Sequence, residues 1–130
     1  MPRCLLAPGR KVTALTLDPV ATNPDHYKVI FENDRVRVLE YTDTPGDRTT
    51  QHSHPDSLMY TLSSFRRRLY AGGTERDVEI TAGTTMWLPA QQHAGHNIGD
   101  TASHVIFVEL KDLPSSEGAS LGPDTDQASS

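Results

Sequence analysis

The sequence has little cysteine, no long apolar run and no excess of positive charge, and each shortage excludes a class of protein. The single cysteine, Cys4, excludes an internal disulfide framework. No stretch approaches the roughly 20 apolar residues of a membrane helix, and the first residues lack the apolar segment of a signal peptide. A net charge of -5 gives no electrostatic reason to expect nucleic acid or an anionic membrane as partner. These absences favour a cytoplasmic protein that binds a small molecule.

The 130 residues are enough for one domain with a single core. Residues 113–130 consist mainly of Ser, Gly, Pro, Asp and Ala, which predicts a disordered C-terminal tail. Residues 1–24 are expected to form an N-terminal extension, in which a weak alternation allows an edge strand or a strand swapped into a partner subunit. The folded domain is therefore predicted over residues 25–112.

No segment in this domain has the period and length of an amphipathic helix. Short alternating runs predominate instead, and this pattern is typical of strands. Residues suited to tight turns separate two pairs of these runs, at Asn33-Asp34 and at Gly72-Gly73-Thr74. Consecutive antiparallel strands at this spacing predict an all-β fold, either a β-sandwich or a jelly-roll β-barrel.

A pair of histidines, His52 and His54, stands in the stretch "GDRTTQHSH". Side chains two residues apart on a strand point to the same face. The same parity continues through mostly apolar residues, which predicts that this face is the interior: Asp56, Leu58, Tyr60 and Leu62. Two buried imidazoles need partners, and a metal ion satisfies both. For an isolated pair, exposed or hydrogen-bonded histidines remain the alternative.

A second cluster lies in "GTTMWLPAQQHAGHN", where Gly83, Pro89, His93 and Asn97 recur in order. Together with Gly46, "DRTTQ" and the His52/His54 pair, this cluster resembles the two motifs of the small single-domain cupins, with one residue fewer than usual between Pro89 and His93. The likeness covers roughly residues 25–111. The segments "DHYKVIFENDRVRVLEY", "HSHPDS" and "VIFVELK" look most like a subgroup of compact bacterial cupins associated with β-alanine degradation.

The resemblance implies a cupin-type jelly-roll β-barrel, commonly a homodimer, with one divalent metal ion inside each subunit. The ligands that it implies are His52, His54 and His93. The family's usual glutamate would fall at Leu58 or Met59, neither of which can bind a metal as a carboxylate does. The glycine before the second-motif histidine is replaced by a glutamine, Gln91 or Gln92. The expected site therefore has three histidines and no carboxylate.

Three neutral histidines leave a dipositive ion with open positions. Iron(II) is the favoured ion, because substrate and dioxygen can then bind together, as in three-histidine cupin dioxygenases. Zinc, nickel or manganese would instead support cyclisation of the polyketide-cyclase kind, isomerisation or elimination. The third alternative is a non-catalytic cupin that binds only a metal or a metabolite.

Further candidates follow from position in the predicted strands. Tyr60 is expected to place its hydroxyl in the cavity as a donor or general acid-base group, with a core tyrosine as the alternative. Four residues are candidates for substrate binding, some of which can equally face water: Leu58, Gln91, His96 and His104. Asp56 is expected to cap a turn and Asn97 to brace a loop. In the basic run 66–68, one arginine either reaches a carboxylate substrate or, as we favour, the run forms a solvated strand edge.

Overall fold

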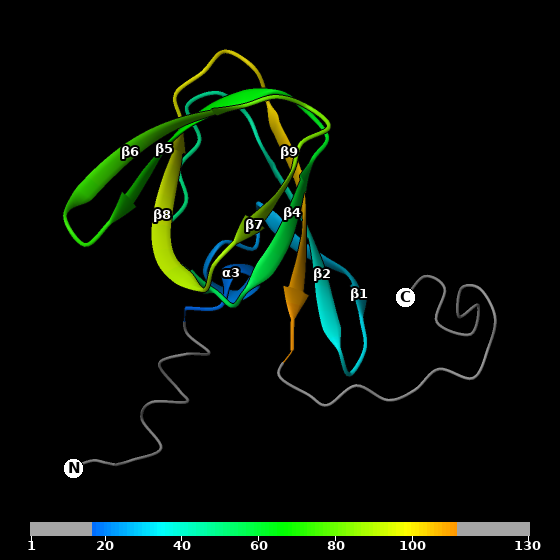
Figure 1. Cartoon of the computed structure of the whole chain (residues 1–130). Coiled ribbons are helices and arrows are strands. Elements are labelled where there is room, and N and C mark those ends of the chain that lie inside the picture. Colours follow the sequence, from blue (N-terminus) through cyan, green and yellow to red (C-terminus); the bar gives the residue numbers. More distant parts are fainter. Residues whose placement is uncertain (1–16, 112–130) are drawn as a thin grey trace, which may run out of the picture.

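The computed structural model describes residues 17–111, so the predicted C-terminal tail and most of the N-terminal extension lie outside the described range. Within it the chain forms one short helix, α3 (Pro19–Thr22), and nine strands (Figure 1). The strands are β1 (Tyr27–Glu32), β2 (Val36–Asp43), β3 (His52–His54), β4 (Ser57–Thr61), β5 (Phe65–Ala71), β6 (Thr74–Ile80), β7 (Thr85–Leu88), β8 (Gln91–Asn97) and β9 (Ser103–Leu110). In residues 17–111 there is no helix with the length and apolar character needed to span a membrane.

The strands form two sheets. One has the order β1-β2-β9-β4-β7 and the other has the order β3-β8-β5-β6. Every pairing between these strands is antiparallel. The two sheets face each other and enclose the interior of the domain (Figure 1). The predicted all-β barrel is confirmed.

Both predicted hairpins form at the turn residues that predicted them. Between β1 and β2 the Asn33 side chain accepts hydrogen bonds from the backbone N–H groups of Arg35 and Val36, at 2.8 and 2.9 Å. Between β5 and β6, Gly72 and Gly73 have φ angles of 56° and 81°. Positive φ at both central residues matches the right-handed twist of the flanking strands. The turns therefore fix the register of each hairpin.

The hydrophobic core lies on the inner face of the five-stranded sheet. Leu39 and Tyr41 of β2 stand opposite Phe107 and Val105 of β9, and all four are buried. Tyr27 and Phe65 complete the buried cluster. Each such side chain contributes about 1.5–3 kcal/mol on burial. The alternation along β9 then makes Glu109 the next inward residue, where it is only 3% exposed.

The chain breaks its alternation between β3 and β4. Ser57 and Thr61 of β4 are buried, whereas Leu58 and Tyr60 are 40% and 43% exposed. The prediction that Leu58, Tyr60 and Leu62 continue the inward face of the histidine pair is therefore wrong. The physical reason is the bend at 55–56, in which the Asp56 carboxylate accepts a hydrogen bond from the Ala90 backbone N–H at 2.9 Å. Asp56 therefore lies in a bend, as expected, but the hydrogen bond of its side chain joins the bend to the residue before β8 rather than capping its own turn.

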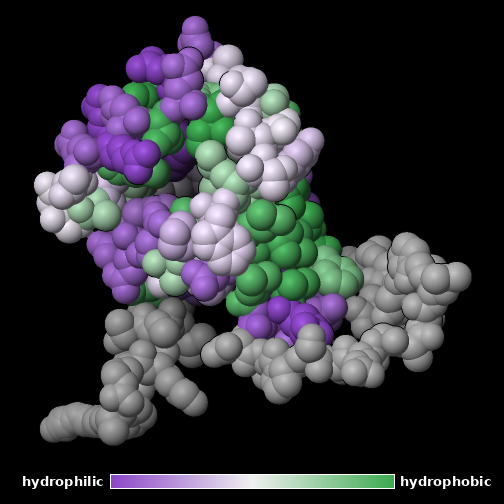
Figure 2. All heavy atoms as spheres, viewed as in Figure 1, coloured by the Kyte–Doolittle hydropathy of each residue, from purple (hydrophilic) through white to green (hydrophobic). Residues whose placement is uncertain are grey.

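The outward side chains of β4 contribute to an apolar area on the outer face of the five-stranded sheet (Figure 2). In register, Leu58 lies between Trp87 of β7 and Val108 of β9, and Tyr60 stands beside Ile106. Trp87 is 51% exposed. The shift of parity after β3 therefore moves apolar residues from the expected cavity wall to the surface.

Within the described part of the N-terminal extension, residues 19–22 form the short helix α3. The stretch that could form an edge or swapped strand lies mostly outside the described residues, and at its described end the Leu17 backbone oxygen accepts a hydrogen bond from the Ser53 backbone N–H at 2.7 Å. Asp18 caps α3: its carboxylate accepts hydrogen bonds from the backbone N–H groups of Val20 and Ala21. After the helix, the Asn23 side chain accepts a hydrogen bond from the Thr50 backbone N–H at 2.9 Å. This contact ties the extension to the residues that lead into β3.

Candidate metal site

The three predicted histidine ligands come together, and we call them the histidine cluster: His52, His54 and His93. His52 and His54 share one face of β3, and His93 of β8 is the direct cross-strand partner of His52. All three are buried, and one ring nitrogen from each lies within 4.8 Å of the others. The ring centroids are 4.9 to 5.2 Å apart. Pairing between two short strands thus assembles the cluster.

Hydrogen bonds at Nδ1 orient two of these rings. Nδ1 of His52 lies 2.7 Å from the backbone oxygen of Thr50, and Nδ1 of His93 lies 2.7 Å from Oε1 of Gln91. Each of these oxygens accepts a hydrogen bond from the ring. Nδ1 therefore carries the N–H, and Nε2 carries the lone pair. The Asn23 amide nitrogen lies farther from His52 Nδ1, at 3.5 Å, and the shorter contact to Thr50 decides the assignment.

The third ring has a buried carboxylate behind it. Nδ1 of His54 and Oε2 of Glu109 are 3.5 Å apart. Neither atom has a hydrogen-bond partner among the described residues. The other oxygen of Glu109 accepts a hydrogen bond from Arg37 Nε at 2.9 Å, which holds the carboxylate in place. The arrangement matches the carboxylate–histidine pair that supports metal ligation in proteins.

Two of the histidines, His52 and His93, are held neutral at physiological pH. Burial, together with the nearby imidazole of His54 and Arg67, lowers the pKa of His52 to about 4. Burial and the two neighbouring imidazoles likewise lower the pKa of His93 to about 3. Neutral imidazole is the form that binds a metal. The donor set therefore fits a divalent ion.

Tyr27, which sequence reasoning missed, lies against the histidine cluster. Its hydroxyl oxygen is 3.1 Å from Nε2 of His52 and 3.4 Å from Nε2 of His54. The side chain is 4% exposed. Burial and nearby Tyr41 raise the pKa of its hydroxyl well above the usual value. The only sequence signal was its place as the first residue of the first strand, beside the core positions.

A cavity of about 510 Å³ borders the cluster at Tyr27 and His93. Its wall is predominantly apolar, with side chains from both sheets, including Met59, Phe65 and Phe107. Gln91 also lines it, in agreement with the prediction that this amide lies near the site. The Gln91 amide donates to the Pro89 backbone oxygen at 3.0 Å while its oxygen meets His93. Gln91 therefore orients His93 and also faces the cavity.

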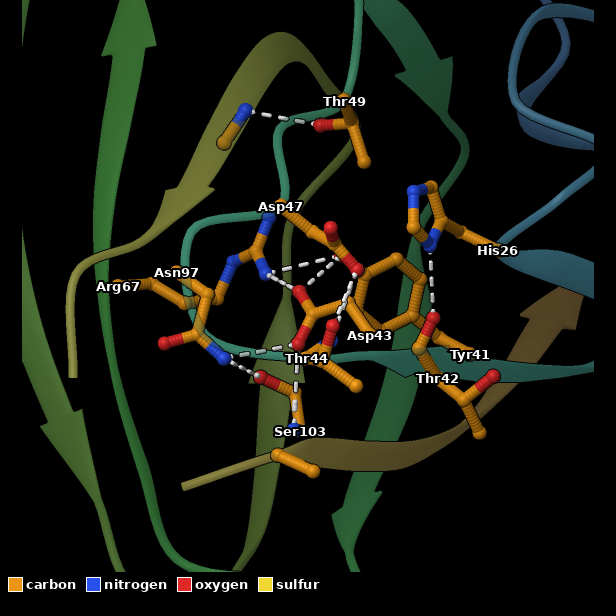
Figure 3. Close-up of polar contacts among 12 residues, drawn as sticks. His26, Tyr41, Thr42, Asp43, Thr44, Asp47, Thr49, Arg67, Asn97 and Ser103 are labelled. Carbon is orange, nitrogen blue, oxygen red and sulfur yellow. Dashed lines mark hydrogen bonds and ion pairs between the residues drawn. The ribbon is translucent and has the colours of Figure 1, made fainter. Parts of the chain in front are cut away.

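A second buried polar group, which we call the arginine network, lies farther along the interior and comprises Arg67, Tyr41, Asp43, Asn97 and Ser103 (Figure 3). Arg67 Nη1 donates to the Tyr41 hydroxyl at 2.9 Å and to the Asp43 carboxylate at 2.6 Å. Asn97 Nδ2 donates to the same carboxylate at 2.9 Å. Burial alone would raise the pKa of Asp43, but its hydrogen bonds and Arg67 lower it. Asp43 is therefore an ionised partner for Arg67.

Asn97 also donates to the backbone oxygen of Thr101 at 2.9 Å and accepts from the Gly99 backbone N–H at 3.0 Å. Its predicted loop-bracing role is confirmed. The basic run alternates as strand geometry requires: Arg68 faces outward and bonds Asp77 at 2.7 Å, whereas Arg67 turns inward. The favoured strand edge is therefore wrong, because β5 lies between β8 and β6; Arg68 is solvated on the outer face, whereas Arg67 lines the cavity.

Arg67 fits inside because β8 has a glycine beneath its guanidinium. A Cβ atom at Gly95 would lie 1.9 Å from Arg67 Nη2. Gly95 stands midway between His93 and Asn97 on the inward face of β8. The inward face of β8 thus carries His93 of the histidine cluster, Gly95, which leaves room for Arg67, and Asn97, which braces the loop after the strand.

Four other predicted site residues lie away from the cavity. Tyr60 and Leu58 are on the outer face of β4, for the reason given above. His96 lies at an outward-facing position of β8, whereas His93 and Asn97 face inward. His104 has the outward parity of β9 and meets Glu40 Oε2 at 2.7 Å. The predicted placement of these side chains in the site is wrong for this subunit.

No protein-family model matches the chain, and no curated protein matches its sequence. Among solved structures, the chain is similar to a cupin domain from Bordetella pertussis, with 25% identity and a TM-score of 0.62 over 66% of this chain and 92% of that one. A cupin superfamily protein from Desulfitobacterium hafniense has 17% identity and a TM-score of 0.50, over 66% and 76% of the two chains.

The polyketide cyclase RemF from Streptomyces resistomycificus has 18% identity and a TM-score of 0.52, over 75% of this chain and 72% of its own. At these identities the likeness concerns the fold. The two-sheet barrel, the buried histidine cluster and these neighbours agree, and the chain has the fold of a small cupin.

Proposed function

We propose that the chain is a metal-dependent enzyme that acts on a small organic molecule, with one divalent ion per subunit bound by the histidine cluster. A single observation carries the proposal. Each Nδ1 atom of the cluster faces an oxygen acceptor, whereas one nitrogen from each ring meets the others in a buried space beside the cavity. Nitrogen lone pairs arranged in this way suit a metal ion.

The ion that we favour is iron(II), and the reaction is oxidation of the substrate by dioxygen. Three neutral imidazoles leave the bound ion its full charge and open positions for substrate and dioxygen. The chain's own residues orient the site: the Thr50 backbone oxygen and Gln91 orient two of the rings, and the apolar wall keeps water away from the reacting molecule. Arg67 also lines the cavity, where its charge is paired with that of Asp43.

A second candidate uses the same site without dioxygen. In this alternative zinc, nickel or manganese polarises a carbonyl group, and the product is a cyclised, isomerised or eliminated molecule. The aromatic lining of the cavity, including Phe65 and Phe107, is the observation that favours it, because such walls accommodate flat conjugated molecules. Cyclisation is also the activity named for the RemF neighbour.

Metal analysis of protein purified without a tag, followed by oxygen uptake, separates the candidates. The dioxygenase should retain iron and, after anaerobic loading with iron(II) and a substrate from a library of small organic molecules, consume dioxygen when air is admitted. Stoichiometric zinc and turnover without dioxygen would overturn the iron proposal and support the second candidate. Retention of unchanged ligand would indicate a binding protein. No retained metal at all would overturn the metal site.

We also propose that the working unit is a homodimer, as the family resemblance implies. The apolar area around Leu58, Tyr60 and Trp87 is the surface that we assign to a second copy, because two such sheet faces can bury each other isologously. Light scattering after size exclusion should give twice the chain mass, and Trp87→Lys should shift it to the monomer. A wild-type monomer at working concentration would contradict the assignment.

A further inference from the structure

We propose that the hydroxyl oxygen of Tyr27 is a fourth protein ligand of the metal ion, an inference that rests on the proposed metal site. The oxygen lies 3.1 Å from Nε2 of His52 and 3.4 Å from Nε2 of His54. Two donor atoms that share an ion at about 2.1 Å are themselves about 3.0 to 3.4 Å apart, for octahedral and tetrahedral angles respectively. Both distances match a shared ion.

Among residues 17–111, no Asp or Glu side chain adds a competing carboxylate oxygen to the three-histidine group. Glu109 faces Nδ1 of His54, on the side of the ring opposite to Nε2. Leu58, where the family motif has a glutamate, is on the outer face. Tyr27 therefore supplies an oxygen donor that the sequence motif lacks, from a different strand.

Packing holds the Tyr27 ring in this position. Its centroid is 4.7 Å from that of Tyr41, 5.3 Å from that of His52 and 6.0 Å from that of Phe107. Tyr27 is also paired in register with Tyr41 across β1 and β2. A buried ring with aromatic neighbours on several sides loses little further freedom when its oxygen binds an ion. The ligand is thus preorganised.

Coordination breaks the phenolic O–H bond and forms a metal–oxygen bond, and the proton passes to the solvent buffer. Proton release is a general accompaniment of metal binding in proteins. With three neutral imidazoles and one phenolate, a dipositive ion retains a net charge of one. This ligand set leaves fewer open positions than three histidines alone, and it places an anionic donor beside the site where substrate binds.

Iron(III) provides the direct test, because a phenolate bound to iron(III) gives a charge-transfer band in the visible and characteristic resonance Raman modes of the ring. The iron(III)-loaded full chain should show both. Tyr27→Phe, which removes only the oxygen, should lose them while retaining iron. Tyr41→Phe is the matched control, because its ring is adjacent but its hydroxyl bonds Asp43 and Arg67, and it should keep the band.

A second variant covers the case in which Tyr27→Phe does not fold. The chain has four tyrosines, so replacing Tyr41, Tyr60 and Tyr70 by Phe leaves Tyr27 alone, and the band should survive. The proposal is overturned by an iron-loaded wild type without the band, by a band that persists in Tyr27→Phe, or by its loss in the triple variant. A wild type that binds no metal overturns the proposed function as well, so the two failures are distinguishable.

Discussion

The histidine cluster and the arginine network occupy the same interior and differ in how their polar atoms are satisfied. In the arginine network, Asp43 accepts from Arg67, Tyr41, Asn97 and the Ser103 backbone, so the charge of the carboxylate is compensated within the chain. In the histidine cluster, Nδ1 of His52 and Nδ1 of His93 are hydrogen-bonded on the outer side of the rings, and nitrogen atoms face one another within. A closed network stabilises the fold, whereas an open one is suited to a ligand.

Replacing a member of the histidine cluster should have the largest effect on metal binding. We expect His93→Ala to weaken metal binding by about 100-fold or more, because it removes a ligand rather than its support. Metal content after dialysis measures the loss. His104→Ala is the matched control, since His104 is paired with Glu40 on the outer face, and it should retain the metal. Full retention in His93→Ala would contradict the site.

Breaking the arginine network should instead destabilise the fold. Asp43→Ala leaves Arg67 as an uncompensated cation whose side chain is only 11% exposed. Removal of one partner of such a buried pair costs about 3–5 kcal/mol in the free energy of unfolding. Urea denaturation measures the cost, and metal stoichiometry in the folded fraction should not change. Asp77→Ala, which breaks the exposed pair with Arg68, should cost much less. Equal losses would erase the distinction between buried and exposed pairs.

Acid should destabilise the metal-free protein through the histidine cluster. The folded-state pKa values of about 4 for His52 and about 3 for His93 lie below the unfolded value of about 6.5. The unfolded chain therefore binds more protons between these limits, and stability falls as pH decreases, by up to roughly 1.4 kcal/mol per pH unit for each histidine. Urea curves of chelator-treated protein from pH 7 to pH 4 test this. His93→Gln should make the dependence shallower; an unchanged slope would show that His93 does not contribute.

Weakening the support of a ligand should have a smaller effect than removing the ligand. Glu109→Gln keeps the size of the side chain but removes the carboxylate behind His54, and we expect metal affinity to fall by about 10- to 100-fold. Competition with a chelator gives the affinity. Glu40→Gln, which alters an outer-face carboxylate, is the control and should bind the metal as the wild type does. No change in Glu109→Gln would mean that Glu109 serves Arg37 alone.

The smallest effect is expected outside both groups. Tyr60→Phe removes a hydroxyl from the outer face of β4, and the free energy of unfolding and the metal affinity should change by no more than about 0.5 kcal/mol. Thermal melts and chelator competition measure the two quantities. A large loss of activity in this variant, with intact metal binding, would restore the catalytic role that strand parity first indicated.

Sequence pattern was sufficient for the elements that depend on local rules. Turn residues predicted the two hairpins, and the spacing of His52 and His54 predicted that they share a face. The resemblance to small cupins added His93. The error began at Pro55, because parity arguments assume an uninterrupted strand and the bend there shifts the alternation by one. Tyr60 and Leu58 were misplaced for that reason.

Other site residues depend on contacts that no local pattern contains. Tyr27 of β1 and Glu109 of β9 belong to the five-stranded sheet, whereas the histidines belong to β3 and β8 of the other sheet. They meet only because the two sheets face each other. Glu109 did carry a signal: a glutamate ends a run of inward positions that includes Val105 and Phe107. A charged residue at an inward-facing strand position predicts a buried polar or charged partner, although the sequence does not identify that partner.

The glycine under Arg67 couples two positions that are distant in the chain. Any side chain at position 95 would displace the guanidinium from Asp43 and Tyr41 and push a cation toward the cavity beside His93. Residues 67 and 95 are therefore coupled: a side chain at position 95 should be accommodated better once Arg67 has been replaced by a shorter residue, and replacement of Arg67 in turn requires a neutral residue at position 43.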